Sequence, residues 1–205
     1  DTKNVGEVTV TVTGKGNYSG TVQRKYQITK APLTVETQSD SKVYDGKPLT
    51  APGTVKGFVE GENAELQVTG KQTDVGSSKN TYKIVWTETT KADNYQVSET
   101  VGTLTVTDQS IEDGKKITVG TLGDVVYTGK NQKQEPAVTT KDGKTTLVKG
   151  TDYTLSYSED TKNVGEVTVT VTGKGNYSGK VQRKYQITKA PLTVTTEGAT
   201  RAYNG

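Results

Sequence analysis

The chain has 205 residues, of which 29% are hydrophobic, and its 26 Lys and Arg residues nearly balance its 23 Asp and Glu residues. This balance gives none of the basic surface that nucleic-acid-binding proteins need, so no nucleic-acid partner is expected. Because Cys, Met and His are all missing from the sequence, disulfide bonds, thiol chemistry, imidazole catalysis and the usual zinc sites are excluded.

The N-terminal stretch of the sequence recurs later in the chain. Residues 1–35 reappear as residues 160–194, an offset of 159 positions, with a single difference between the two copies. Recurrence at a fixed offset is typical of a tandem-repeat protein. Shorter motifs recur within this long period, since the YDGK of residues 44–47 resembles the YTGK of residues 127–130. We therefore predict two related modules that alternate, each of about 80 residues, an ordinary size for a small domain.

We expect residues 1–29 to be the C-terminal part of a preceding module. Val8, Val10 and Val12 alternate with threonines in this segment, which is the period-two pattern of a strand with one buried face. The recurrence predicts that these valines and their equivalents in the second copy face a core, while the threonines face outward. The equivalent residues are Val167, Val169 and Val171.

Residues 30–107 are predicted to be the first complete module. The large apolar residues occupy even positions before Pro32 and odd positions after it, so the chain changes there from one core to the next. Trp86, the only Trp of the chain, alternates with Ile84 and Tyr82. It is expected to anchor the core of this module.

Residues 108–188 are predicted to be the second complete module, and residues 189–205 the start of a following one. Apolar and small polar residues alternate in residues 153–157, which is again a strand signal. The junction near residues 108–116 contains Gly114 and no proline. We expect it to be more mobile than the junctions that contain proline.

These patterns together predict an all-β chain. Turn signals such as Asp45-Gly46 and Asp142-Gly143 separate the alternating strands. The best candidate for a helix is a short stretch near residues 60–66, and Gly61 weakens it. We predict tandem small β-sandwich or β-grasp-like modules that are arranged end to end.

Four motifs carry a resemblance to a known family. They are YDG at residues 44–46, NVG at residues 163–165, GKGNY at residues 173–177 and YQITKAPLTV at residues 185–194. With these motifs the chain resembles the YDG/MBG-type tandem repeat domains of bacterial, chiefly Gram-positive, cell-surface adhesins. The resemblance implies an extracellular array, anchored to the cell wall through regions outside these residues, and it brings no catalytic residues. Residues 91–95 (KADNY) depart from the GKGNY motif, so the role of that turn need not be the same in both modules.

The remaining chemical signals favour ordinary loops. Without His or Cys the usual nucleophile and base pairs are missing, so no enzyme is predicted. The carboxylate pairs Glu112-Asp113 and Glu159-Asp160 are best explained as solvated turn residues. The loop at residues 158–163 offers oxygens but lacks the spaced ligands of a calcium site, and the glycines of residues 173–177 open no helix that could bind phosphate. We predict no catalytic, cofactor or metal residues, although bound calcium and a Lys–Asn cross-link stay open.

Four tyrosines beside turns are candidate ligand-facing residues, because exposed aromatic rings often stack on sugars. The alternative is that each ring closes one end of a thin core, with its hydroxyl in contact with water or the backbone. The four are Tyr18, Tyr95, Tyr127 and Tyr177.

Two functional hypotheses follow from the sequence. In the first, the chain is a non-catalytic stalk that projects a distal binding domain, and its partners are neighbouring modules of the same chain. In the second, the modules themselves bind a host glycan, a mucin or a matrix protein. No apolar run is long enough to cross a membrane, so no membrane insertion is expected in this segment.

Overall fold

The computed structural model describes residues 2–205 and divides the chain into two compact units, one ending at Thr107 and one beginning at Asp108. The prediction of an all-β fold is confirmed, because the regular elements of the described residues are all strands apart from one short 3₁₀ turn, Ala92–Asn94. The helix considered near residues 60–66 is wrong. Residues 60 and 61 form a turn in which Gly61 has a φ of +81°, and β6 (Ala64–Val68) follows as a strand.

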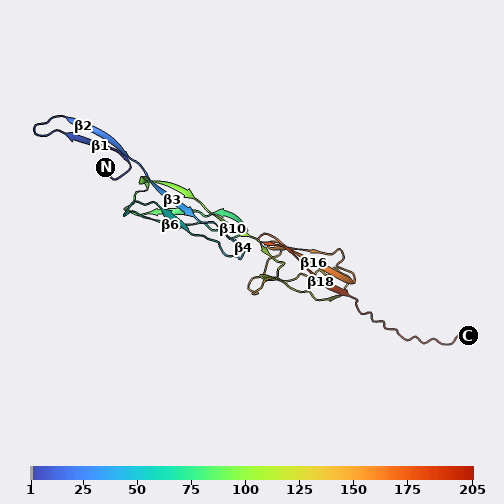
Figure 1. The fold of residues 1–205 in the computed structure, drawn as a ribbon. Coiled ribbons are helices and arrows are strands. Elements are labelled where there is room, and N and C mark those ends of the chain that lie inside the picture. The colour runs from blue at the N-terminus through green and yellow to red at the C-terminus, as the bar shows by residue number, and fades with distance from the viewer. Residues whose placement is uncertain (1) are drawn as a thin grey trace. The chain divides into compact units, whose positions relative to one another are not determined.

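The first unit begins with a two-stranded hairpin of β1 (Gly6–Thr13) and β2 (Thr21–Ile28) (Figure 1). The strands pair antiparallel, from Gly6 opposite Ile28 to Thr13 opposite Thr21. In this sheet neither strand has a second neighbour. The hairpin therefore has two free edges.

The rest of the first unit contains three small sheets. In two of them, the first and last strands of the module run parallel, since β3 pairs with β9 and β4 pairs with β10. Strand orders are β5-β3-β9, β4-β10-β7 and β6-β8. The bounds are β3 (Ala31–Thr37), β4 (Asp40–Val43), β5 (Gly53–Lys56), β7 (Gly76–Lys79), β8 (Tyr82–Trp86), β9 (Tyr95–Thr100) and β10 (Thr103–Thr107).

A buried polar network holds these sheets together where β3 passes to β4. The amide of Asn80, which is fully buried, donates through Nδ2 to the carbonyls of Gln38 (2.9 Å) and Ala51 (3.0 Å). The Thr37 hydroxyl donates to the Asn80 carbonyl (2.8 Å) and accepts from the Gly102 N–H (3.0 Å). A Cβ at Gly102 would lie 2.3 Å from the Gln38 carbonyl carbon, so the backbones approach too closely here for any other residue.

The second unit is built around a four-stranded sheet in the order β13-β18-β16-β15. Its two central strands, β16 and β18, are labelled in Figure 1. Two short pairs, β12-β14 and β11-β17, accompany it. The bounds are β11 (Gln109–Ser110), β12 (Ile117–Val119), β13 (Val125–Val126), β14 (Val138–Thr140), β15 (Tyr153–Tyr157), β16 (Gly165–Gly173), β17 (Tyr177–Ser178) and β18 (Lys180–Thr188).

The valines of β16 face the core of this unit, as predicted. Val167, Val169 and Val171 are essentially fully buried, whereas Thr168 and Thr170 between them are only half-buried. Val171 packs with residues from β12, β14 and β15, and Val167 and Val169 pack with Tyr185 and Ile187 of β18. The period-two pattern therefore identified both the strand and its inward face.

The identical valines of β1 behave differently. Val8 is buried, but Val10 is 46% exposed and Val12 is 65% exposed, so the prediction that all three face a core is wrong for Val10 and Val12. Tyr26 of β2 is 47% exposed, while its equivalent Tyr185 is 2% exposed. The strand alternation is the same in both copies, and what differs is whether another segment covers the apolar face.

The expected junction at residues 108–116 needs a correction. Only Asp108 separates β10 from β11, and Ile111 is already buried in the core of the second unit. Gly114, with a φ of +61°, therefore lies in a loop inside the second unit rather than in the connection. Residues 189–205 form no strand, and their Leu192 and Val194 are exposed, whereas the equivalent Leu33 and Val35 are fully buried in β3.

Candidate functional site

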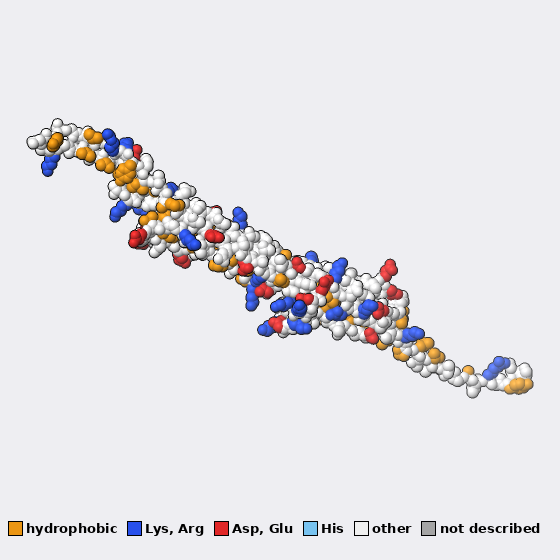
Figure 2. Space-filling model, in the orientation of Figure 1, with side chains coloured by type: hydrophobic (Ala, Val, Ile, Leu, Met, Phe, Trp, Pro, Cys, Tyr) orange, Lys and Arg blue, Asp and Glu red, His pale blue; other side chains and the backbone are white. Residues whose placement is uncertain are grey.

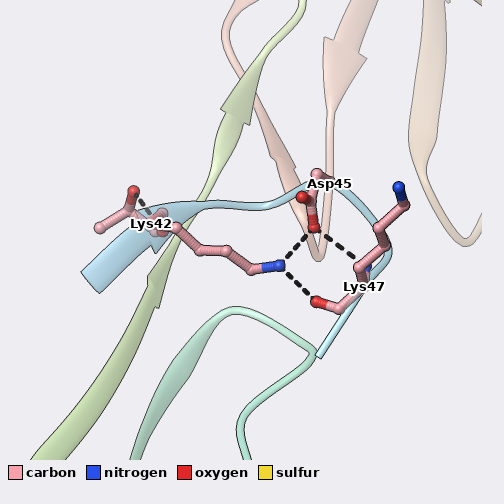
Figure 3. Close-up of polar contacts among 4 residues, drawn as sticks. Lys42, Asp45 and Lys47 are labelled. Carbon is pink, nitrogen blue, oxygen red and sulfur yellow. Dashed lines mark hydrogen bonds and ion pairs between the residues drawn. The ribbon is translucent and has the colours of Figure 1, made fainter. Parts of the chain in front are cut away.

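The YDG motif at residues 44–46 forms a closed turn (Figure 3). Asp45 Oδ1 accepts hydrogen bonds from the Lys47 N–H (2.9 Å) and from Lys42 Nζ (2.5 Å), and Lys42 Nζ also donates to the Lys47 carbonyl (2.5 Å). The hydrogen bond from Lys42 is the main cause that lowers the pKa of Asp45. Gly46 has a φ of +74°, which glycine adopts readily. Tyr44 packs against the buried core, so the motif serves to fix a turn.

An aromatic cluster lies at the other end of the same module. The rings of Trp86 and Tyr95 stack with centroids 5.8 Å apart, and Phe58 meets both rings edge-on. Tyr95 is buried, and its hydroxyl donates to Glu62 Oε2 (2.6 Å) and accepts from the Val59 N–H (3.1 Å). Burial is the main cause that raises the pKa of Tyr95. Trp86 itself is only half-buried, so it belongs to this cluster and leaves part of its ring accessible.

The accessible part of Trp86 lines a shallow groove of about 560 Å³ between β8 and β9. One wall of the groove is formed by alternate side chains of β8. The other wall is formed by side chains of β9 and by Val101, and Lys79, Thr81 and Lys83 lie at the margin. The central residues are Tyr82, Ile84, Trp86, Val97, Glu99 and Val101.

A hydrogen bond between Tyr82 and Glu99 fixes the positions of two polar groups in this groove. The Tyr82 hydroxyl donates a short hydrogen bond to Glu99 Oε2. Burial, followed by this bond, raises the pKa of Tyr82 to about 12, so the hydroxyl stays protonated at neutral pH. Aromatic faces beside a fixed carboxylate and lysine amines suit a polar ring such as a sugar. Nothing in this set resembles a nucleophile activated by a base.

The four tyrosines predicted to face a ligand are not brought together. Tyr18 is 80% exposed near the tip of the β1–β2 hairpin. Tyr127 and Tyr177 are half-buried and pack against the two core clusters of the second unit. Tyr95 is 3% exposed, so its ring offers no surface to a ligand and differs from the expectation in that respect. The groove instead uses Tyr82, which the strand pattern had grouped with core residues because it alternates with Ile84.

A second set of contacts joins the hairpin to the module that follows it. Asn94, at the end of the 3₁₀ turn, accepts the Val5 N–H at its Oδ1 (3.0 Å) and donates from Nδ2 to Asn4 Oδ1 (3.1 Å). We call these contacts the Asn94 clasp. Residues 92–95 depart from the GKGNY motif, but their Asn and Tyr both make contacts. Asn94 binds Asn4 and Val5 just before the hairpin, and Tyr95 fills the adjacent core.

The carboxylate pairs singled out in the sequence lie in turns. Glu112 Oε1 accepts the Lys180 N–H (2.7 Å), and Asp113 accepts the Lys115 N–H (2.9 Å). Asp160 accepts the N–H groups of Lys162 and Asn163, bonds that lower its pKa. Within residues 2–205 no group of three or more acidic, His or Cys side chains is placed to hold a metal ion. No helix in the same residues is long and apolar enough to span a bilayer.

Comparison with known proteins identifies the first module. A family model described as MBG domain (YGX type) matches residues 33–105, and no curated protein matches the chain. The match runs from β3 into β10 and includes the YDG turn, the aromatic cluster and the groove. Domains of this family are repeat domains typical of extracellular surface proteins. Residues 33–105 of this chain are therefore similar to MBG domains of the YGX type.

Proposed function

We propose that this chain is a non-catalytic repeat segment of a bacterial cell-surface adhesin, which acts as an extended stalk and projects a distal binding domain. In this proposal the array is attached to the cell wall through regions outside these residues. The observation that carries the proposal is the Asn94 clasp, because it ties the residues just before the β1–β2 hairpin to the module that follows the hairpin. Joints of this kind suit a stalk, since loosely tethered modules can fold back on one another and hold a distal domain less far away.

Short connections support the same proposal. Only two residues separate β2 from β3, and one residue separates β10 from β11. Pro32 restricts the backbone at the first connection and favours an extended conformation of the residue before it. Near-identical copies of a segment also suit a spacer, which depends on repetition rather than on a unique site.

Spin-label distance measurements test the clasp directly. Because the natural chain has no Cys, labels can be attached to single cysteines introduced at two exposed positions, Thr9 of β1 and Thr54 of β5. We expect a narrow distance distribution in the parent and a clearly broader one in Asn94→Ala. Asn17→Ala, at the exposed hairpin tip, is the matched control and should leave the distribution narrow. A broad distribution in the parent, or no change in Asn94→Ala, would contradict the stalk.

The groove beside Trp86 favours a second candidate function, in which the module binds a host glycan. The supporting observation is the pairing of Tyr82 with Glu99 beside two apolar walls. A glycan array probed with the whole chain tests it, with Tyr82→Ala and Glu99→Gln as variants that leave the aromatic cluster in place. Signals that disappear in both variants support binding in the groove. An array without signals, or signals that both variants retain, refutes it.

A further inference from the structure

The groove beside Trp86 lies between two strand edges that have no partner strand. Among residues 2–205, β8 pairs only with β6, and β9 pairs only with β3. Each of them is the outer strand of its sheet, and the groove lies between them. The free edge of a strand presents backbone N–H and C=O groups that can pair with another chain.

The separation of β8 from β9 is a feature of the first module. DVG at residues 74–76 corresponds to NVG at residues 163–165, and each motif leads into a strand. In the second unit this strand, β16, is continuous and pairs with the last strand, β18, at eight successive positions. In the first module β7 and the last strand, β10, pair at only four positions. The buried Asn80 follows β7, and beyond it the chain enters β8, which does not pair with β9.

Half-buried apolar side chains line the groove. On β8 they are Tyr82, Ile84 and Trp86, and Val97 belongs to β9. Figure 2 shows that hydrophobic side chains reach the surface of the first unit beside charged ones. A strand added along β8 would place every second side chain against the groove, since side chains alternate between the two faces of a strand. Apolar residues at those positions would bury surface that now contacts water.

The margin of the groove carries positive charge. Lys79 and Lys83 lie there, and within residues 2–205 neither of them forms an ion pair. Lys83 stands between Tyr82 and Ile84, so its side chain belongs to the opposite, outer row of β8. Outer side chains of an added strand would lie beside this row, where opposite charges stabilise a cross-strand pair. The carboxylate of Glu99, which also lines the groove, already accepts the Tyr82 hydroxyl.

We propose that β8 and the groove beside it bind an extended peptide of a partner protein, in which apolar residues alternate with acidic ones. The peptide adds to the free edge of β8 as a further strand and lies between β8 and β9. Its apolar side chains fill the groove, and its acidic side chains lie beside Lys79 and Lys83.

This proposal is independent of the stalk, and it concerns the same groove as the glycan candidate. A sugar binds through side chains and would leave both strand edges without partners. Strand addition uses an edge for affinity and the alternating side chains for specificity. The two free edges therefore favour a peptide as the ligand.

A synthetic peptide of sequence EVSVEVSVE serves as the probe with the whole chain. Its glutamates recur every fourth residue, as do Lys79 and Lys83. The peptide contains no Trp, so binding can be followed through the fluorescence of Trp86, the only Trp of the chain. We expect a saturable change in this fluorescence. A peptide that causes no such change would overturn the proposal.

N-methylated peptides test whether the backbone of the ligand takes part. Methylation of every second nitrogen removes the N–H donors from one edge of the peptide and keeps all side chains. Two such peptides, one for each edge, should differ, and the one methylated on the edge that meets β8 should bind at least tenfold more weakly than the unmodified peptide. Equal affinities of all three peptides would show that no strand is added.

Reversal of one charge tests the position of the ligand. Lys83 is exposed, so Lys83→Glu should fold normally. It should weaken the binding of EVSVEVSVE at least threefold and strengthen that of KVSVKVSVK. The matched control is Lys71→Glu, an exposed position of the same unit outside the groove, which should change either affinity less than twofold. Equal effects of the two variants would contradict the assigned site.

The same reagents separate a peptide ligand from a glycan. Peptide binding together with a glycan array that gives no signal would support strand addition and refute the glycan candidate. Array signals that Tyr82→Ala and Glu99→Gln abolish, together with no peptide binding, would overturn strand addition and leave the glycan as the ligand.

Discussion

The two copies of one sequence provide an internal measurement of what burial contributes to stability. Val171 and Val12 occupy equivalent positions, but Val171 is fully buried and Val12 is 65% exposed. Substitution of a buried valine by alanine removes about 1.6 kcal/mol of transfer free energy, at about 0.8 kcal/mol per methyl or methylene group. The cavity that remains raises the loss to about 2–3 kcal/mol for Val171→Ala. For Val12→Ala only about 0.5 kcal/mol is expected, because most of the side chain already contacts water.

Hydrogen exchange followed by mass spectrometry can separate the two substitutions, because the substitution changes the mass of fragments from the copy that carries it, and fragments that contain Thr21 or Lys180 differ in sequence. In Val171→Ala we expect faster exchange throughout β15, β16 and β18, and an unfolding transition of the second unit at lower urea concentration. Trp86 lies in the first unit, so its fluorescence should report an unchanged transition. Val12→Ala should leave the stability of the second unit unaltered. If the two substitutions destabilised the chain equally, burial would not be the property that distinguishes the two copies.

Three further predictions concern the first unit. Asn80→Ala removes the side-chain donor from the buried Ala51 carbonyl and the partly buried Gln38 carbonyl. It should lower the free energy of unfolding by about 1–3 kcal/mol, measured by urea titration of Trp86 fluorescence; an effect below about 0.5 kcal/mol would contradict a stabilising role of the network. Trp86→Ala should lower the melting temperature of this unit through a loss of about 2–3 kcal/mol, less than for a fully buried Trp, and an unchanged melting temperature would show that the ring does not support the fold. Because the pKa of Tyr82 is raised to about 12 from an ordinary value near 10, only the unfolded chain loses this proton between those pH values. Stability should therefore fall as pH rises from about 10 to about 12, and Tyr82→Phe should weaken this dependence; an identical pH profile in the variant would refute the shift.

Strands and turns followed from local features of the sequence. Alternation in residues 165–173 has a period of two, which only a strand places on one face, so β16 and its inward valines were predictable. Asp45 and Gly46 likewise specified a turn, because Asp can accept a backbone N–H two residues ahead and Gly tolerates a positive φ. Gly61 weakened the helix candidate near residues 60–66, and its positive φ in a turn explains why no helix forms there.

The candidate groove could not be read from the sequence. Tyr82 and Glu99 are joined by a hydrogen bond only because β8 and β9 border the same groove, and no local pattern indicates which strands become neighbours. The burial of Tyr95 could not be read from the sequence either, since its position beside a turn suggested an exposed ring. The packing of Phe58 and Trp86 against it buries the ring instead.

The repeated segment shows most clearly which features follow from local sequence and which follow from tertiary contacts. Residues 6–28 and 165–187 form the same hairpin in the same register, so the sequence by itself determined the strands, their pairing and which side chains share a face. Whether that face is a core or a surface was decided by tertiary structure alone. Val169 is buried because residues 108–157 lie over it, whereas Val10, in an identical local sequence, has no such cover among the described residues. The physical reason is that alternation depends on backbone geometry within one segment, while burial depends on contacts with residues far away in the chain.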